Sequence, residues 1–188
     1  MLFDFVICAI GWIIIACHTW SLKYHFNMPV TPPGVRLIST LVLLSATFLT
    51  FLVFTTEQPL VASLTGLVLL VFSFVMFWIT IRESSEAKLL AAFDEDLPQG
   101  LLKTGPYAYV RHPFYTSYLI QWVGWAIASW SPWGIVPVVF MTTTYYVAAT
   151  GEEKKFTKTS MADEYSTYKA RTGKFLPKLF AGKNTKTD

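Results

Sequence analysis

Long apolar runs decide what this chain can become. Residues 2–22, 35–55 and 60–81 are each as long as the run of about 20 predominantly apolar residues that a helix needs to cross a bilayer. Two shorter apolar runs, 114–130 and 134–150, lie at the lower limit of that length. Only 14% of the residues are charged, whereas soluble domains carry about 25%. The sequence therefore predicts an all-α integral membrane fold with about five transmembrane helices.

The flanks of the apolar runs indicate how the chain is organised. The first run begins with Asp4 and no basic residue, which favours a retained helix over a cleaved signal peptide. The short link TEQP between the second and third runs predicts a tight helical hairpin. Residues 82–94 are typical of a short helix leaving the membrane, and Pro137 predicts a bent last span packed against protein. We expect the whole chain, 1–188, to form one domain.

The polar tail, 151–188, predicts one amphipathic helix. Its apolar positions are Phe156, Met161, Tyr165 and Tyr168. A helix with such a stripe lies either on the membrane surface or on the protein core.

The basic residues predict the orientation in the membrane. With the N-terminus outside, all 15 Lys and Arg residues fall on one side or at its helix ends, while Asp4 and Glu57 lie on the other. This asymmetry follows the positive-inside rule and makes the segment 82–113 and the tail cytoplasmic. The net charge of +3 thus indicates contact with anionic lipid headgroups and not nucleic-acid binding. The short chain, with no obvious retention signal, favours a prokaryotic inner membrane.

The densest polar chemistry lies at residues 104–115, TGPYAYVRHPFY, directly before an apolar run. Polar groups beside a membrane core are costly unless they are satisfied, and they often mark function. Taken singly, each has an ordinary explanation: Arg111 as a headgroup anchor, His112 as a helix cap, and the pair Glu152–Glu153 as a solvated helix end. The spacing of Cys and His residues suits no metal site, so no metal is expected.

Taken together, these pieces resemble a known superfamily. TGPYAYVRHPFY, then a short hydrophobic hairpin, then EEKKF and EYSTYKARTGKFLP are similar to the isoprenylcysteine carboxyl methyltransferases and phospholipid methyltransferases. The resemblance covers about residues 85–178. It implies a membrane methyltransferase that uses S-adenosylmethionine and releases S-adenosylhomocysteine. The implied cofactor pocket is cytoplasmic and formed by the loop before the fourth helix and the C-terminal tail.

The resemblance and the chemistry of the cofactor together nominate site residues. Aromatic faces suit the sulfonium, cationic donors at Arg111 and His112 suit the carboxylate, and a glutamate suits the ammonium. The expected cofactor-binding residues are Gly100, Leu101, Leu102, Gly105, Tyr107, His112, Pro113, Phe114, Tyr115 and Glu152. The expected catalytic residues are Glu152, Glu153, His112 and Arg111.

The acceptor is the least determined part of this prediction. We expect a lipophilic acceptor that enters from the bilayer between helices, either isoprenylcysteine carboxylate-like or another hydrophobic small molecule. In the isoprenylcysteine enzymes an Arg one turn before the Glu pair helps to hold the substrate carboxylate, and Ala148 stands there in this chain. Phospholipid or amine N-methylation is the alternative, and an amine would need Glu153, His112 or a Tyr as base. An NADPH-dependent membrane reductase and a non-enzymatic scaffold are the competing classes.

Overall fold

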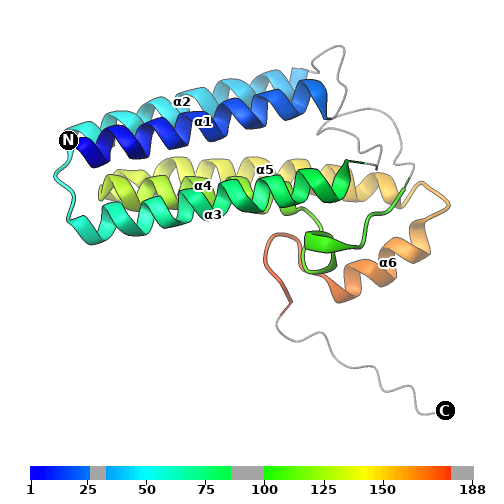
Figure 1. The fold of residues 1–188 in the computed structure, drawn as a ribbon. Coiled ribbons are helices and arrows are strands. Elements are labelled where there is room, and N and C mark those ends of the chain that lie inside the picture. Colours follow the sequence, from blue (N-terminus) through cyan, green and yellow to red (C-terminus); the bar gives the residue numbers. More distant parts are fainter. Residues whose placement is uncertain (26–32, 86–99, 179–188) are drawn as a thin grey trace.

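The computed structural model describes residues 1–25, 33–85 and 100–178, and these form helices and no strand (Figure 1). The all-α prediction is confirmed. The 3₁₀ helices are η1 (Gly105–Ala108) and η2 (Pro132–Gly134). The α-helices are α1 (Leu2–Tyr24), α2 (Pro33–Thr55), α3 (Leu60–Ser84), α4 (Pro113–Ser129), α5 (Ile135–Phe156) and α6 (Ala162–Arg171).

Four of these helical segments are long and apolar enough to span a membrane. They are Leu2–Tyr24, Pro33–Thr55, Leu60–Ser84 and Pro132–Phe156. The helix expected over 114–130 is present as α4, but it is not among these four candidate spans. Its 17 residues give a length of about 26 Å, less than the roughly 30 Å hydrocarbon core. α4 nevertheless runs through the bundle between α3 and α5 (Figure 1).

The outer face of α3 shows why this bundle suits lipid. Val61, Val68, Phe72, Val75 and Ile79 are all exposed. Their spacing of seven, four, three and four residues puts them on one stripe of the helix. Such a continuous apolar stripe is unfavourable in water and matches the acyl chains of a bilayer. The finding supports a multi-pass integral membrane protein.

Small residues let α3 and α4 approach closely. A Cβ at Gly66 would lie 2.5 Å from the Cβ of Ala128 and 2.6 Å from the carbonyl oxygen of Gly124. Farther along the same interface, the Ser73 hydroxyl donates a 2.7 Å hydrogen bond to the Ser117 carbonyl. Such close backbone packing and buried hydroxyl bonds are typical of membrane helix pairs. They hold α4 firmly, and α4 carries part of the candidate site.

Two sequence predictions, the tight hairpin between the second and third runs and the effect of Pro137, can be compared with the structure. α2 ends at Thr55 and α3 begins at Leu60, which confirms the tight hairpin. Pro137 lies in the first turn of α5, where a missing N–H costs no intrahelical hydrogen bond. α5 therefore continues without interruption to Phe156. Of the helix expected over 82–94, residues 86–99 lie outside the described residues.

The predicted amphipathic tail helix is α6, which packs on the protein, but Phe156 of the expected stripe ends α5 and Met161 precedes α6. α6 buries Tyr165 and Tyr168, and the Tyr168 hydroxyl donates a 2.7 Å hydrogen bond to the carbonyl of Tyr107 in η1. The chain after α6 then runs beside the loop before α4. There the amide of Arg111 donates to the Gly173 carbonyl at 2.8 Å, and the amide of His112 donates to the Lys174 carbonyl at 3.2 Å. The tail is thus joined to the loop by backbone hydrogen bonds.

Candidate active site

The loop before α4 owes its shape to Gly105 and Pro113. Gly105 adopts φ +54°, a left-handed conformation that favours glycine. A Cβ there would also lie 2.6 Å from the carboxyl group of Glu83 at the end of α3. Pro113 takes the first position of α4, where its fixed φ suits helix initiation. Between them, the backbone amides of Arg111 and His112 are hydrogen-bonded to the tail.

Glu153 is the centre of a buried ionic cluster. Its Oε1 accepts a 2.9 Å hydrogen bond from Nε of Arg111, and the two side chains are only 6% and 7% exposed. Its Oε2 lies 3.1 Å from Nζ of Lys169 and 3.7 Å from Nζ of Lys174. The guanidinium of Arg111 also donates to the carbonyl of Thr172. Glu153 and Arg111 therefore join the end of α5, the loop and the tail.

His112 lies between the two glutamates. Its Nε2 is 3.2 Å from Oε1 of Glu153, and its Nδ1 is 3.4 Å from Oε2 of Glu152. Since an ionised carboxylate only accepts hydrogen bonds, both ring nitrogens must carry a proton to make these contacts. Burial disfavours the charged ring, but the hydrogen bonds and charges of Glu152 and Glu153 outweigh it and raise the pKa of His112 above 6.5. The two glutamates therefore favour the protonated, cationic form of the ring.

Glu152 has a different environment from its neighbour. Its Oε1 accepts a 2.6 Å hydrogen bond from the Tyr115 hydroxyl, and its side chain is 25% exposed. The Tyr115 ring stacks on His112 at 5.7 Å and on Tyr145 at 5.2 Å between centroids, and meets Phe175 edge-on at 6.3 Å. A partly open carboxylate therefore lies beside a group of aromatic rings.

The comparisons with known proteins agree with this geometry. The model of the phospholipid methyltransferase family matches residues 61–164, which is more than half of the chain. The chain belongs to this family. Among curated proteins, no match to the chain was found. Family membership makes the chain a membrane methyltransferase that uses S-adenosylmethionine, and it decides against the reductase and scaffold alternatives.

The side chains of this phospholipid methyltransferase family member suit S-adenosylmethionine. A carboxylate offers about four lone-pair positions, and Glu152 uses one for Tyr115 and a long contact for His112. It therefore retains acceptors for an ammonium group. The rings of Tyr115 and Phe175 offer faces and edges of the kind that host a sulfonium.

The remaining predicted residues divide into two groups. Pro113, Phe114 and Tyr107 are buried, and the ring of Phe114 lies 5.9 Å from that of Phe77 in α3, between centroids. Gly100 is exposed, and Leu101 and Leu102 are half-buried, on the segment that leads into η1. In the described part of the chain, no hydrogen bond joins these last three to Glu152 or His112. Their role in cofactor binding stays a prediction.

The structure also identifies residues that sequence reasoning missed. Lys169 and Lys174 contact Glu153, and Lys174 additionally donates to the Thr150 hydroxyl at 2.7 Å and lies 4.4 Å from the centre of the Tyr146 ring. In the sequence they are two of several lysines in a polar tail. The one available signal was their spacing after Tyr168, which keeps them close to the end of α6.

Proposed function

We propose that the chain transfers a methyl group from S-adenosylmethionine to a nucleophile on a lipid-like acceptor, and that Glu152 is the central residue of this site. The observation that supports Glu152 is the contrast with Glu153. Glu153 is buried and contacted by four basic side chains. Glu152 is partly exposed, and its carboxylate keeps lone pairs that can accept further hydrogen bonds.

In this proposal, Glu152 binds the cofactor ammonium and the rings around Tyr115 adjoin the sulfonium. His112, as a cation, holds Glu152 in place and adds positive charge for the cofactor carboxylate. Arg111 is bound to Glu153 and to tail carbonyls, so it shapes the site from behind. Gly105 and Tyr107 shape the loop that precedes these residues.

Methyl transfer requires that the cofactor and the acceptor be held in the right geometry and that water be excluded. When bound, S-adenosylmethionine supplies an electrophilic methyl group for an in-line displacement. An amine acceptor must also lose a proton. The two glutamates favour the protonated ring of His112, and the cations around Glu153 favour its ionised form, so neither is a suitable base. Because Glu152 is assigned to the cofactor ammonium, the proton of an amine acceptor passes to water in this proposal.

A specific observation favours an amine-bearing lipid over a carboxylate acceptor. Ala148 is buried where the isoprenylcysteine enzymes carry an Arg, and the Arg111 guanidinium is already engaged. Among the described residues, no guanidinium next to Glu152 is left for an acceptor carboxylate. The family match to phospholipid methyltransferases points the same way.

We also propose that the site faces the cytoplasm. The end of α1 and the start of α2, which carry Lys23 and Arg36, lie at the same end of the bundle as α6 (Figure 1). The start of α1 and the link between α2 and α3, which carry Asp4 and Glu57, lie at the other end (Figure 1). This is the arrangement expected from the positive-inside rule with the N-terminus outside.

Calorimetric binding of S-adenosylhomocysteine to the detergent-purified chain tests the proposal. Glu152→Gln should weaken binding at least tenfold, since a charge-assisted bond to an ammonium contributes about 1.5–3 kcal/mol. Glu57→Gln is the matched control at the opposite end of the bundle and should bind as the wild type does. Equal binding by the wild type and Glu152→Gln would remove Glu152 from the cofactor site.

The acceptor is tested with a labelled methyl donor. Phosphatidylethanolamine in nanodiscs is compared with a farnesylated cysteine analogue in the same nanodiscs. We expect label in the phospholipid and little in the analogue. Label in the analogue alone would reject the amine acceptor and leave the methyltransferase assignment intact.

A further inference from the structure

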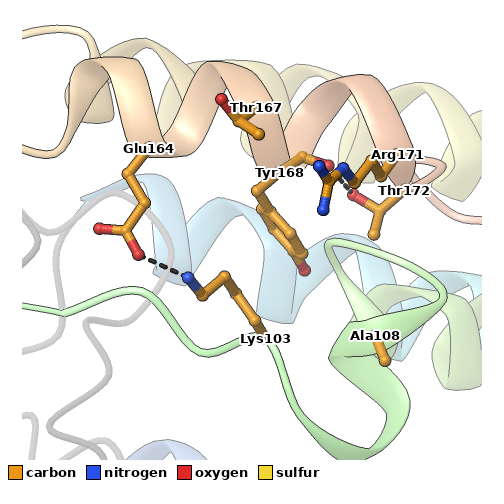
Figure 2. Close-up of a pocket in the computed structure, with 7 residues that line it drawn as sticks. All are labelled: Lys103, Ala108, Glu164, Thr167, Tyr168, Arg171 and Thr172. Carbon is orange, nitrogen blue, oxygen red and sulfur yellow. Dashed lines mark hydrogen bonds and ion pairs between the residues drawn. The ribbon is translucent and has the colours of Figure 1, made fainter. Parts of the chain in front are cut away.

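A second pocket lies between α6 and the segment that leads into η1. Its volume is about 350 Å³, and none of Glu152, Glu153 and His112 lines it. Lys103 comes from the segment before η1, and Glu164, Thr167 and Arg171 come from α6 (Figure 2). Because positions 164, 167 and 171 share one face of a helix, the pocket is built by one side of α6.

Arg171 is a cationic side chain that lines this pocket. Its guanidinium has no hydrogen-bond or ion-pair partner within residues 1–25, 33–85 and 100–178. The carbonyls at the end of α6, which such a side chain could cap, are already occupied. Lys178 donates to the carbonyls of Lys169 and Ala170 at 3.0 and 2.8 Å, and Arg111 donates to that of Thr172. Arg171 instead extends along the pocket beside Tyr168 and Thr172 (Figure 2).

Lys103 supplies a second cation on the opposite wall. Its ammonium pairs with Glu164 at 2.5 Å, but the two side chains are 47% and 51% exposed. Such an exposed pair contributes little and exchanges readily with another anion. With Arg171 opposite, the pocket holds two cations against one carboxylate, so it has a surplus of positive charge.

We propose that this pocket binds a phosphate group, held by the guanidinium of Arg171 and the ammonium of Lys103. A guanidinium fork matches two phosphate oxygens, and an ammonium adds a point charge. The hydroxyls of Thr167 and Thr172 already donate to the Asp163 and Tyr168 carbonyls, so recognition depends on the two cations. S-adenosylmethionine carries no phosphate, which separates this ligand from the cofactor.

Two sources could present that phosphate at the basic end of the bundle: a phospholipid headgroup or a free phosphate compound. The experiment therefore has two arms. Inorganic phosphate is titrated into the full chain in phosphatidylcholine nanodiscs by calorimetry. In the second arm, retention of phosphatidic acid against phosphatidylcholine is measured by native mass spectrometry of the detergent-purified chain. Binding in either arm identifies the source only if it depends on Arg171.

Three variants test whether phosphate binding depends on Arg171 and Lys103. Arg171→Gln should weaken phosphate binding about tenfold, as expected for one lost charge-assisted contact. Lys158→Gln removes the same charge from the exposed turn between α5 and α6 and should bind as the wild type does. Glu164→Gln should bind more tightly, because it frees Lys103 from its competitor.

S-adenosylhomocysteine binding is measured on the same variants. It should be unchanged in Arg171→Gln, whether or not Glu152 proves to bind the cofactor. Equal loss of phosphate binding in Arg171→Gln and Lys158→Gln would mean general charge attraction and would overturn the site. Loss of S-adenosylhomocysteine binding in Arg171→Gln would assign the pocket to the cofactor and overturn it as well.

Discussion

Replacing Glu153 by glutamine should release the tail from the loop before α4. Glu153 and Arg111 are 6% and 7% exposed and lie 2.9 Å apart, and breaking such a buried pair costs about 3–5 kcal/mol. Glutamine can still accept one hydrogen bond, and Arg111 keeps its contact with the Thr172 carbonyl, so we expect about 3 kcal/mol, at the lower end of that range. Lys169 is 53% exposed and adds little. This free energy corresponds to a roughly hundredfold easier opening of the tail.

Hydrogen exchange of single amides measures this opening. The amides of Arg111, His112 and Gly173, which form the backbone bonds between loop and tail, should exchange about a hundred times faster in Glu153→Gln. Glu152→Gln is the matched control and should leave their exchange within about threefold of wild type, since among the described residues Glu152 contacts Tyr115 and His112 and no group of the tail. Unchanged exchange in Glu153→Gln would refute the reasoning that the buried carboxylate holds the tail.

Two further predictions follow from the packing and from the histidine. Gly66→Leu should lower the thermal unfolding midpoint strongly, because its Cβ alone would lie 2.5 Å from that of Ala128; a midpoint equal to that of the wild type in the same detergent would contradict the close packing of α3 and α4. The pKa of His112 is raised in the folded state, so its stabilising contacts are complete below about pH 6.5 and are lost as the pH rises through the raised pKa. Tail protection in hydrogen exchange, corrected for the intrinsic rate, should therefore fall on the alkaline side, and His112→Gln should abolish this step.

The membrane helices were largely predictable because hydropathy measures what a bilayer demands. The expected spans 2–22 and 60–81 became α1 (Leu2–Tyr24) and α3 (Leu60–Ser84), with differences of two or three residues at one end. The last span shows the limit of this reasoning. Residues 134–150 were expected, yet α5 continues to Phe156, because charged residues at the membrane surface end the apolar run without ending the backbone hydrogen bonds.

The candidate site was only partly predictable. Motif spacing nominated His112, Glu152 and Glu153, and the structure does bring them into contact. The resemblance assigned Glu152 alone to the cofactor, but it did not predict how the surroundings of the two glutamates differ, because that difference arises from partners far along the chain. Lys169 and Lys174 reach Glu153 only once α6 has folded back onto η1, and a tertiary contact of that kind leaves no periodic signal.

The different tasks of the two glutamates follow from helix geometry. Successive residues on an α-helix point about 100° apart. Glu152 therefore faces the aromatic rings, while Glu153 faces the loop and the tail. His112 touches both, and it therefore couples the packing of the tail to the position of Glu152. A chain whose tail opens would lose the orientation of the glutamate proposed to bind the cofactor, although no residue beside that glutamate had changed. In the proposed site, the tail would thus contribute to cofactor binding, and Glu153 would act on the reaction through Glu152.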